Sequence, residues 1–135
     1  MSKVIHLRSN LLIDTHALLW WLGTPERVSR TATGALENIE TRVYVSAAVV
    51  WEIAIKVNLG KLDAQDVVTG FRELMMAKGF HRLAISTDHA LRAGMLPRHH
   101  SDPFDRMLVA QAQALNCPIV SADARLDSYG VRRIW

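Results

Sequence analysis

The sequence predicts an α/β fold in which a central, mostly parallel β-sheet lies between helices. Short apolar runs alternate with longer amphipathic segments, a pattern typical of successive strand–helix units. Half of the 135 residues are apolar, which is enough to fill a core at this length. Because no repeat or low-complexity segment interrupts the alternation, we expect a single domain over residues 1–135, with residues 1–10 as a candidate N-terminal extension.

The elements of the first half follow from apolar runs and from residues that begin or end helices. Ser29 and Ser46 are suitable helix N-caps, and Gly60 is a suitable C-terminal stop. In chain order we expect a strand at 11–13, a helix at 15–22, a turn at 23–26, a helix after Ser29 to about 38, a strand at 43–45 and a strongly apolar helix after Ser46 to about 59.

The second half continues the same alternation. Gly79 predicts the end of one helix, and Thr87 predicts the N-cap of the next. Asp102 is the predicted N-cap of a further helix, with Pro103 as its first residue. We therefore expect, in order, a helix at 66–78, a strand at 82–85, a helix at 88–95, a loop at 97–101, a helix from 103 to about 116, a strand at 119–121, a short turn at 124–127 and a last strand at 131–134.

Composition restricts the class of protein. The net charge of +3 is compatible with a nucleic-acid partner but does not require one. The single Cys117 cannot form a disulfide within the chain. The longest apolar run, 43–55, contains Glu52 and is too short to cross a bilayer, and the first residues lack the apolar core of a secretory signal. We therefore expect a cytoplasmic protein without a membrane partner.

Four carboxylates fall where predicted strands end or where the following helices begin. Asp14 directly follows the strand at 11–13, and Asp123 follows the strand at 119–121. Glu52 lies in the first half of its helix, and Asp105 lies in the first turn of another. In a parallel sheet these positions share one edge, where ligands bind. We therefore expect the four acids to converge on one crevice.

Closely packed carboxylates predict a divalent cation. Unpaired, they would repel one another and raise some pKa values, whereas a hard cation with oxygen ligands resolves the repulsion. The sequence contains no Cys/His cluster with zinc spacing, so Mg²⁺ or Mn²⁺ is the expected ion. Such a site could orient a water molecule and stabilise charge on a phosphodiester during its hydrolysis.

Each acid also has an ordinary structural interpretation. Asp14 and Asp123 could be helix or turn caps, and Asp105 could complement a helix dipole. Glu52 and Lys56 could form an i,i+4 ion pair worth only about 0.2–0.5 kcal/mol. The apolar neighbours of Glu52 weaken this interpretation, because a carboxylate among them is costly to bury without a partner. Taken together, the four acids favour a functional site.

Other polar residues are weaker candidates. His99 and His100 lie in a loop after Pro97 and are expected to be solvated, with a phosphate contact as the alternative. His16 could touch a substrate or simply pack. Ser46 could cap its helix or support a site water. Nucleotide-binding loops of the GxxxxGK[ST] or GxGxxG type are absent from the sequence.

Four segments resemble a known family. The segment 12–22, LIDTHALLWWL, looks like the opening of a PIN-domain ribonuclease toxin of the VapC type, and 43–56, VYVSAAVVWEIAIK, is similar to its second motif. The segment 102–112, DPFDRMLVAQA, resembles the third motif, and 120–126, VSADARL, resembles the fourth. Their order and spacing agree with the family over about residues 11–135. Ser121 stands where the family often has Thr.

The resemblance implies a PIN-like α/β/α sandwich and a metal-dependent endoribonuclease. Carried over by motif, Asp14 and Asp105 would be the direct ligands of Mg²⁺ or Mn²⁺, and Glu52 and Asp123 would complete the catalytic and metal site. Asp102 is a secondary candidate. The resemblance further implies a toxin of a type II toxin–antitoxin pair that forms homodimers, is inhibited by a cognate antitoxin in a hetero-oligomer, and meets operator DNA only through that antitoxin.

The expected reaction is hydrolysis of RNA by water, which leaves 5′-phosphate and 3′-hydroxyl ends. Candidate substrate-binding residues, chosen by position, are Ser46, Arg98, Arg106 and Arg125, with Lys56 as a further phosphate contact unless Glu52 occupies it.

Three alternatives remain open at this point. A metal-dependent phosphatase would have a second acid two residues after Asp14, where this chain has His16. A regulatory phospho-receiver domain would need a lysine late in the chain, but the last lysine is Lys78. A catalytically silent RNA-binding domain would not require the four acids.

Overall fold

A parallel sheet organises the computed structural model, which describes residues 9–135. Within this range the sheet has five strands in the order β3-β2-β1-β4-β5, and every pairing is parallel. The strands are β1 (Ser9–Ile13), β2 (Thr41–Ser46), β3 (His81–Leu83), β4 (Ile119–Val120) and β5 (Arg133–Ile134). The expectation of a mostly parallel sheet is confirmed.

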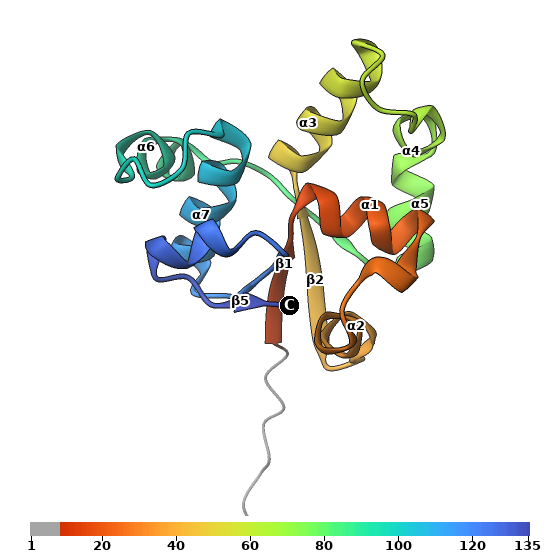
Figure 1. The fold of residues 1–135 in the computed structure, drawn as a ribbon, viewed down its shortest axis with the longest axis horizontal. Helices are drawn as coiled ribbons and strands as arrows, with labels where there is room; N and C mark the ends of the chain where they lie inside the picture. The colour runs from red at the N-terminus through yellow and green to blue at the C-terminus, as the bar shows by residue number, and fades with distance from the viewer. Residues whose placement is uncertain (1–8) are drawn as a thin grey trace, which may run out of the picture.

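Helices fill the connections between the strands (Figure 1). The α-helices are α1 (Thr15–Gly23), α2 (Arg30–Glu37), α3 (Ala47–Asn58), α4 (Gln65–Thr69), α5 (Phe71–Lys78), α6 (Thr87–Met95) and α7 (Pro103–Leu115). Two 3₁₀ turns, η1 (Pro25–Arg27) and η2 (Ala124–Tyr129), complete the path. No helix of residues 9–135 is long and apolar enough to cross a membrane.

The order in which successive strands are added to the sheet changes side at β1. From β1 it moves outward to β2 and β3, and it then returns to the other side of β1 to form β4 and β5. Leu12 of β1 is paired with Tyr44 on one side and with Ile119 on the other. The carboxyl ends of β1, β2 and β4 therefore lie side by side, at the kind of switch point where open α/β sheets bind ligands.

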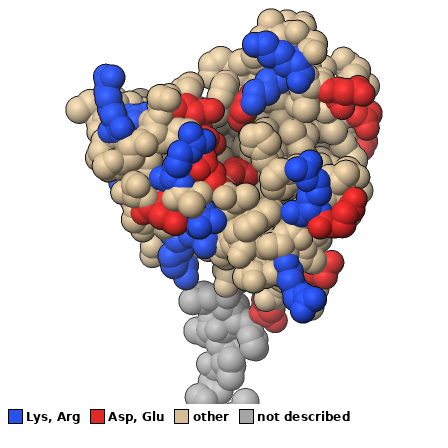
Figure 2. Space-filling model, in the orientation of Figure 1, with Lys and Arg blue, Asp and Glu red and all other residues tan. Residues whose placement is uncertain are grey.

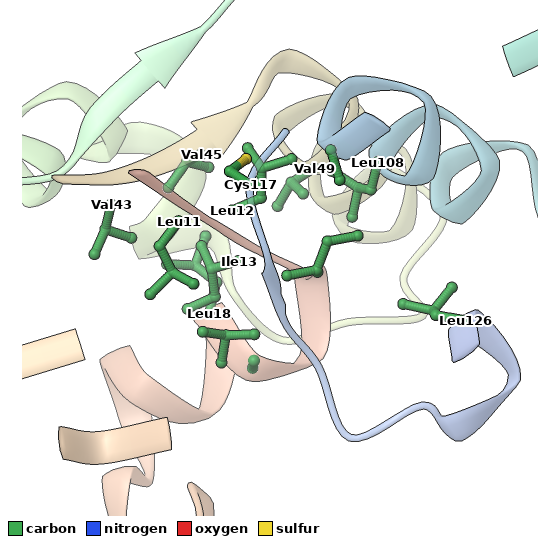
Figure 3. Packing of buried hydrophobic residues seen from close by; sticks show 14 of the residues in the cluster. Leu11, Leu12, Ile13, Leu18, Val43, Val45, Val49, Leu108, Cys117 and Leu126 are labelled. Atoms are coloured by element: carbon green, nitrogen blue, oxygen red, sulfur yellow. The ribbon is translucent and has the colours of Figure 1, made fainter. Parts of the chain in front are cut away.

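The core packs on both faces of the central strands. Leu18 of α1 lies on one side of β1, and Val49 of α3 lies with Leu108 of α7 on the other (Figure 3). Leu12 and Ile13 of β1 are completely buried. A strand buried on both faces needs apolar side chains in both directions, which explains the unbroken run Leu11–Ile13 rather than an alternating pattern.

Most of the predicted helix ends are confirmed. The side chains of Ser29 and Ser46 accept hydrogen bonds from the backbone N–H groups of Ala32 and Ala48. The Asp102 carboxylate caps α7, as expected. Gly79 ends α5 in the left-handed conformation, with φ of 68°, which glycine adopts without a steric penalty.

Four details of the prediction are wrong. The expected helix at 66–78 is two helices, which are separated at Gly70. The N-cap of α6 is Ser86 rather than Thr87, because the Ser86 hydroxyl and the His89 side chain satisfy each other's backbone N–H groups. The third and last strands are shorter than predicted, spanning 81–83 and 133–134. Of the candidate extension, Ser9 and Asn10 belong to β1, and residues 1–8 lie outside the described residues.

Candidate active site

The four predicted acids line one pocket at the carboxyl edge of the sheet. Its volume is about 380 Å³, and it is lined by Asp14, Thr15, His16, Trp20, Glu52, Lys56, Asp102, Asp105, Ala122, Asp123 and Arg125. In the space-filling view, acidic side chains gather around a hollow in this face, with basic side chains on either side (Figure 2). The expected convergence of the four acids in space is therefore observed.

Asp14 lies buried at the end of the central strand β1. It is 5% exposed, and its carboxylate caps α1 by accepting the Ala17 N–H at 2.9 Å. Burial raises the pKa of this carboxyl, and hydrogen bonds from Ser121 and Ala17 oppose that rise. Asp14 is thus both a helix cap and a wall of the pocket, so its capping role does not remove this carboxylate from the site.

Glu52 enters the pocket from α3 and has two partners. Its Oε1 accepts the Thr15 hydroxyl at 2.6 Å, and its Oε2 lies 2.6 Å from Lys56 Nζ. Only 4% of Glu52 is exposed. The i,i+4 ion pair considered from the sequence is present, and it compensates a carboxylate that would otherwise be costly to bury.

Asp102 and Asp105 approach the pocket on the first turn of α7. Asp102 Oδ1 accepts the backbone N–H groups of Phe104 at 2.8 Å and Asp105 at 3.2 Å. The Asp105 side chain is free of this capping role. Its pKa is raised to about 7, because burial removes water from the carboxylate and because Asp102 and Asp14 add negative charge nearby.

Asp123 has the opposite electrostatic environment. Arg125 donates to both of its oxygens, with Nη2 to Oδ2 at 2.9 Å and Nε to Oδ1 at 2.9 Å. These charge-assisted bonds hold the pKa of Asp123 well below its usual range. Adjacent acids of one pocket therefore have pKa values displaced in opposite directions, which is common where side chains have distinct chemical tasks.

His100 is the residue that the sequence interpretation placed wrongly. It was expected to be solvated, yet its side chain is only 4% exposed. Its Nε2 lies 3.1 Å from Asp105 Oδ2 and 3.2 Å from Asp123 Oδ2. One atom each from His100, Asp105 and Asp123 falls within a mutual distance of 4.8 Å. The only signal for this in the sequence is that His100 stands two residues before the N-cap Asp102.

The pocket has the donor set of a hard divalent cation. Carboxylate oxygens from β1, α3, α7 and the turn after β4 face a common space. The raised pKa values of Asp14 and Asp105 come mainly from burial, with a further contribution from the negative charge of neighbouring acids, which a bound cation would offset. Oxygen-rich sites of this kind suit Mg²⁺ or Mn²⁺.

Not all of the predicted substrate contacts reach this pocket. Lys56, Arg125 and His16 line it. Ser46 is fully buried and caps α3 instead. Arg98 lines a different cavity from the acidic one.

Arg106 also points elsewhere. Its guanidinium donates to the carbonyls of Ala93 at 2.9 Å, Leu96 at 2.9 Å and Pro97 at 3.0 Å. The expectation that Arg106 lies at the acidic crevice is therefore corrected: its donors are used to hold the end of α6 and the loop that follows.

Comparison with known proteins adds a family match. A family model described as "PIN domain" matches residues 11–131. Ribonuclease VapC22 from Mycobacterium tuberculosis is 28% identical over 123 residues, which cover 90% of this chain and 92% of that protein.

Solved structures share the fold. DNA-bound VapBC from Salmonella typhimurium matches with a TM-score of 0.69 at 16% identity, covering 93% of this chain and 96% of that one. VapBC2 from Rickettsia felis, bound to a DNA fragment from its promoter, matches with a TM-score of 0.66 at 10% identity, covering 93% and 99%. These likenesses confirm the predicted α/β/α sandwich.

Proposed function

The chain belongs to the PIN domain family, and on that basis we propose that it is a Mg²⁺- or Mn²⁺-dependent endoribonuclease, the toxin of a toxin–antitoxin pair. The observation that carries the proposal is the convergence of Asp14, Glu52, Asp105 and Asp123 in one pocket. The name of a relative that is similar over nine-tenths of the chain, Ribonuclease VapC22, supports RNA as the substrate.

Asp14 and Asp105 would be the direct ligands of the cation, with Glu52 and Asp123 completing its surroundings. When bound, the cation would supply positive charge to polarise water and to stabilise a phosphodiester during hydrolysis. The fit rests on the oxygen-rich lining of the pocket; burial, together with the nearby charges of Asp102 and Asp14, raises the pKa of Asp105 to about 7, and a cation would offset that negative charge.

The remaining residues of the pocket have roles in binding and orientation. Arg125 lies at its wall and would contact phosphate oxygens, whereas Lys56 is occupied by its ion pair with Glu52. Thr15 and Lys56 hold Glu52 in place, where it can accept a hydrogen bond from the attacking water. Water adds to phosphorus and the ribose 3′ oxygen departs with a proton, so the products carry a 5′-phosphate and a 3′-hydroxyl.

We further propose that an antitoxin covers an apolar groove beside the site. The groove has a volume of about 870 Å³ and runs along α3, α5 and the outer strand β3, with Trp51, Phe71, Met76 and Leu83 among its lining residues. Trp51 and Met76 are 63% and 77% exposed, and large exposed apolar surfaces mark interaction sites. Toxin–antitoxin complexes among the structural matches support such a partner, and contact with operator DNA would come only through it. A homodimer within this assembly is part of the proposal.

RNA cleavage tests the proposal directly. Antitoxin-free protein is incubated with total RNA of its host in Mg²⁺, in Mn²⁺ or in EDTA, and the cut ends are mapped chemically. We expect metal-dependent fragments with 5′-phosphates that Asp14→Asn abolishes. Asp63→Asn, which removes the same charge from an exposed loop, is the matched control and should cleave normally.

Other outcomes contradict the proposal in distinct ways. Cyclic 2′,3′-phosphate ends would show attack by the ribose hydroxyl and overturn the assignment of the acids. RNA binding without cleavage would favour a silent binding domain. Release of phosphate from a monoester, with intact RNA, would favour the phosphatase.

A further inference from the structure

The imidazole of His100 connects two carboxylates of the pocket. Nε2 lies within hydrogen-bonding distance of Asp105 Oδ2, at 3.1 Å, and of Asp123 Oδ2, at 3.2 Å. Asp105 comes from α7 and Asp123 from the turn after β4, so the two acids belong to separate parts of the fold. His100 is therefore placed to fix their relative position.

The other ring nitrogen determines which atom carries the proton. The backbone N–H of Asp102 donates to His100 Nδ1 at 3.1 Å. Nδ1 must then present its lone pair, and the imidazole carries its hydrogen on Nε2. An Nε2–H group has no lone pair for a metal ion, but it can donate to Asp123 Oδ2 at 3.2 Å while it lies 3.1 Å from Asp105 Oδ2.

The loop that carries His100 is itself held on several sides. The His100 backbone N–H donates to Tyr129 Oη at 2.9 Å, and that hydroxyl donates to the Pro97 carbonyl at 2.8 Å. Arg106 donates to the same Pro97 carbonyl at 3.0 Å and also binds the Leu96 carbonyl. With so many hydrogen bonds on the loop, the buried ring has one orientation.

We infer that His100 is a positioning residue: its Nε2–H donates to Asp123 and lies against Asp105, and it holds both carboxylates ready for the cation without binding the cation itself. The inference rests on the proposed function, in which these acids form the metal site. Without the donor, two carboxylates at this separation would repel each other and turn apart. Outer hydrogen-bond partners of metal ligands commonly contribute about 10- to 100-fold to metal affinity.

Mn²⁺ affinity, followed by electron paramagnetic resonance, tests the inference in four proteins. We expect His100→Ala to weaken binding by about 10- to 100-fold. His100→Gln should retain most of the affinity, since the glutamine amide can place an N–H donor near the position of Nε2. His99→Gln is the matched control, because His99 is exposed and packs against the Tyr129 ring, and it should bind as tightly as the wild type.

A spectroscopic measurement separates positioning from coordination. With ¹⁵N-labelled histidine, NMR of the metal-free protein should show His100 as the Nε2–H tautomer, identified by its loss in His100→Gln. Pulsed paramagnetic resonance of the Mn²⁺-loaded protein should show no directly coordinated histidine nitrogen. This tautomer measurement uses the wild-type fold, so it decides the matter even if His100→Ala does not fold.

Three results would overturn the inference. A nitrogen coupling to Mn²⁺ that His100→Gln removes would make His100 a metal ligand. Equal affinities of His100→Ala and the wild type, while Asp14→Asn binds weakly, would remove the positioning role and leave the proposed function intact. Absence of Mn²⁺ binding by the wild-type protein would contradict both.

Discussion

The acids of the pocket differ in charge state although they are chemically alike. Arg125 stabilises the ionised form of Asp123, whereas burial and neighbouring acids destabilise the ionised form of Asp105. Asp105 therefore changes its protonation state near neutral pH, and Asp123 stays ionised throughout the physiological range. Protonation of Asp105 near neutral pH would therefore oppose cation binding at the proposed site.

The first prediction concerns the pH dependence of metal binding. The pKa of Asp105 is about 7 in the metal-free protein, so protons compete with the cation below this pH. Because the cation must displace one proton from Asp105 below pH 7, we expect the apparent Mn²⁺ affinity to fall about tenfold for each pH unit below 7. Titration by calorimetry from pH 5.5 to 8.5 measures it, and an affinity independent of pH would contradict the prediction.

The Asp105 carboxyl also makes the stability of the metal-free protein depend on pH. Rising pH, which favours metal binding, is expected to lower this stability. The folded protein holds a proton on Asp105 more tightly than the unfolded chain, whose carboxyl has the usual pKa of 3.8. The free energy of unfolding should therefore decrease as pH rises from 3.8 to about 7. Thermal melts should show a falling Tm over this interval in EDTA, and Mn²⁺ should restore it most strongly above pH 7. An unchanged Tm profile in Asp105→Asn would show that other groups cause the decrease.

At the scale of elements, hydrogen bonds at helix ends determine where the site residues lie. Asp14, Ser46 and Asp102 cap α1, α3 and α7, three helices that begin near the carboxyl edge of the sheet. Two of these caps are also acids of the pocket, so the start of a helix and the wall of the site are formed by the same atoms.

Ser46 gives a prediction that separates a cap from a substrate contact. Its hydroxyl is fully buried and accepts the Ala48 N–H at 3.1 Å. Ser46→Ala should lower the free energy of unfolding by about 0.5–2 kcal/mol and leave KM for RNA unchanged. Chemical denaturation and cleavage kinetics on one preparation measure both. A large increase in KM with unchanged stability would restore Ser46 as a substrate contact.

Arg106 links α7 to the end of α6. Replacing it with Lys keeps the charge but loses the fork that reaches the Ala93, Leu96 and Pro97 carbonyls together. We expect Arg106→Lys to destabilise the protein by about 1–3 kcal/mol, since several carbonyls, two of them partly buried, lose their donors together.

Arg92→Lys is the control for this change. Arg92 is exposed on α6 and its one hydrogen bond, to Gln113, is long at 3.5 Å. Denaturant unfolding of both variants gives the comparison, and equal losses of stability would refute a special role for Arg106.

The elements show what the sequence could predict and what it could not. Apolar runs and local cap residues predicted the strands β1, β2 and β4 and the acids that follow them, because both signals lie within a few adjacent residues. The break at Gly70 was missed, since Gly within an apolar-periodic segment also occurs inside helices. His100 was missed because its burial depends on Tyr129 and Asp123, which are 29 and 23 residues away in the chain.

At the scale of the whole molecule, the acidic pocket and the apolar groove are separate surfaces. Lys56, Trp51 and Ala54 all lie on α3, but Lys56 lines the pocket whereas Trp51 and Ala54 line the groove. A partner in the groove would therefore contact the same helix, α3, that carries Glu52 into the pocket, close enough to extend a segment over the proposed catalytic acids.

Met76 tests this arrangement. Met76→Glu places a charge at a side chain that is 77% exposed in the groove, so the fold and RNA cleavage should be unaffected while binding of the cognate antitoxin weakens at least tenfold. Met95→Glu makes the same change at an 85% exposed methionine on α6, outside the groove, and should bind normally. Affinities come from calorimetry with the co-expressed antitoxin, and tight binding by Met76→Glu would exclude the groove as its docking site.

The position of β1 in the sheet has a consequence for synthesis of the protein. β1 pairs first with β2, which follows it closely in the chain, but its other neighbour β4 comes more than 100 residues after it. Asp123 follows β4, so it cannot join Asp14 until β4 has left the ribosome and docked. The ring of His100, which is hydrogen-bonded to Asp123, is not fixed before then either. A chain interrupted before Ile119 would carry three of the four acids and still lack the assembled pocket. If the chain is the ribonuclease toxin proposed above, its fold would keep it inert through most of its translation by postponing the last strand pairing.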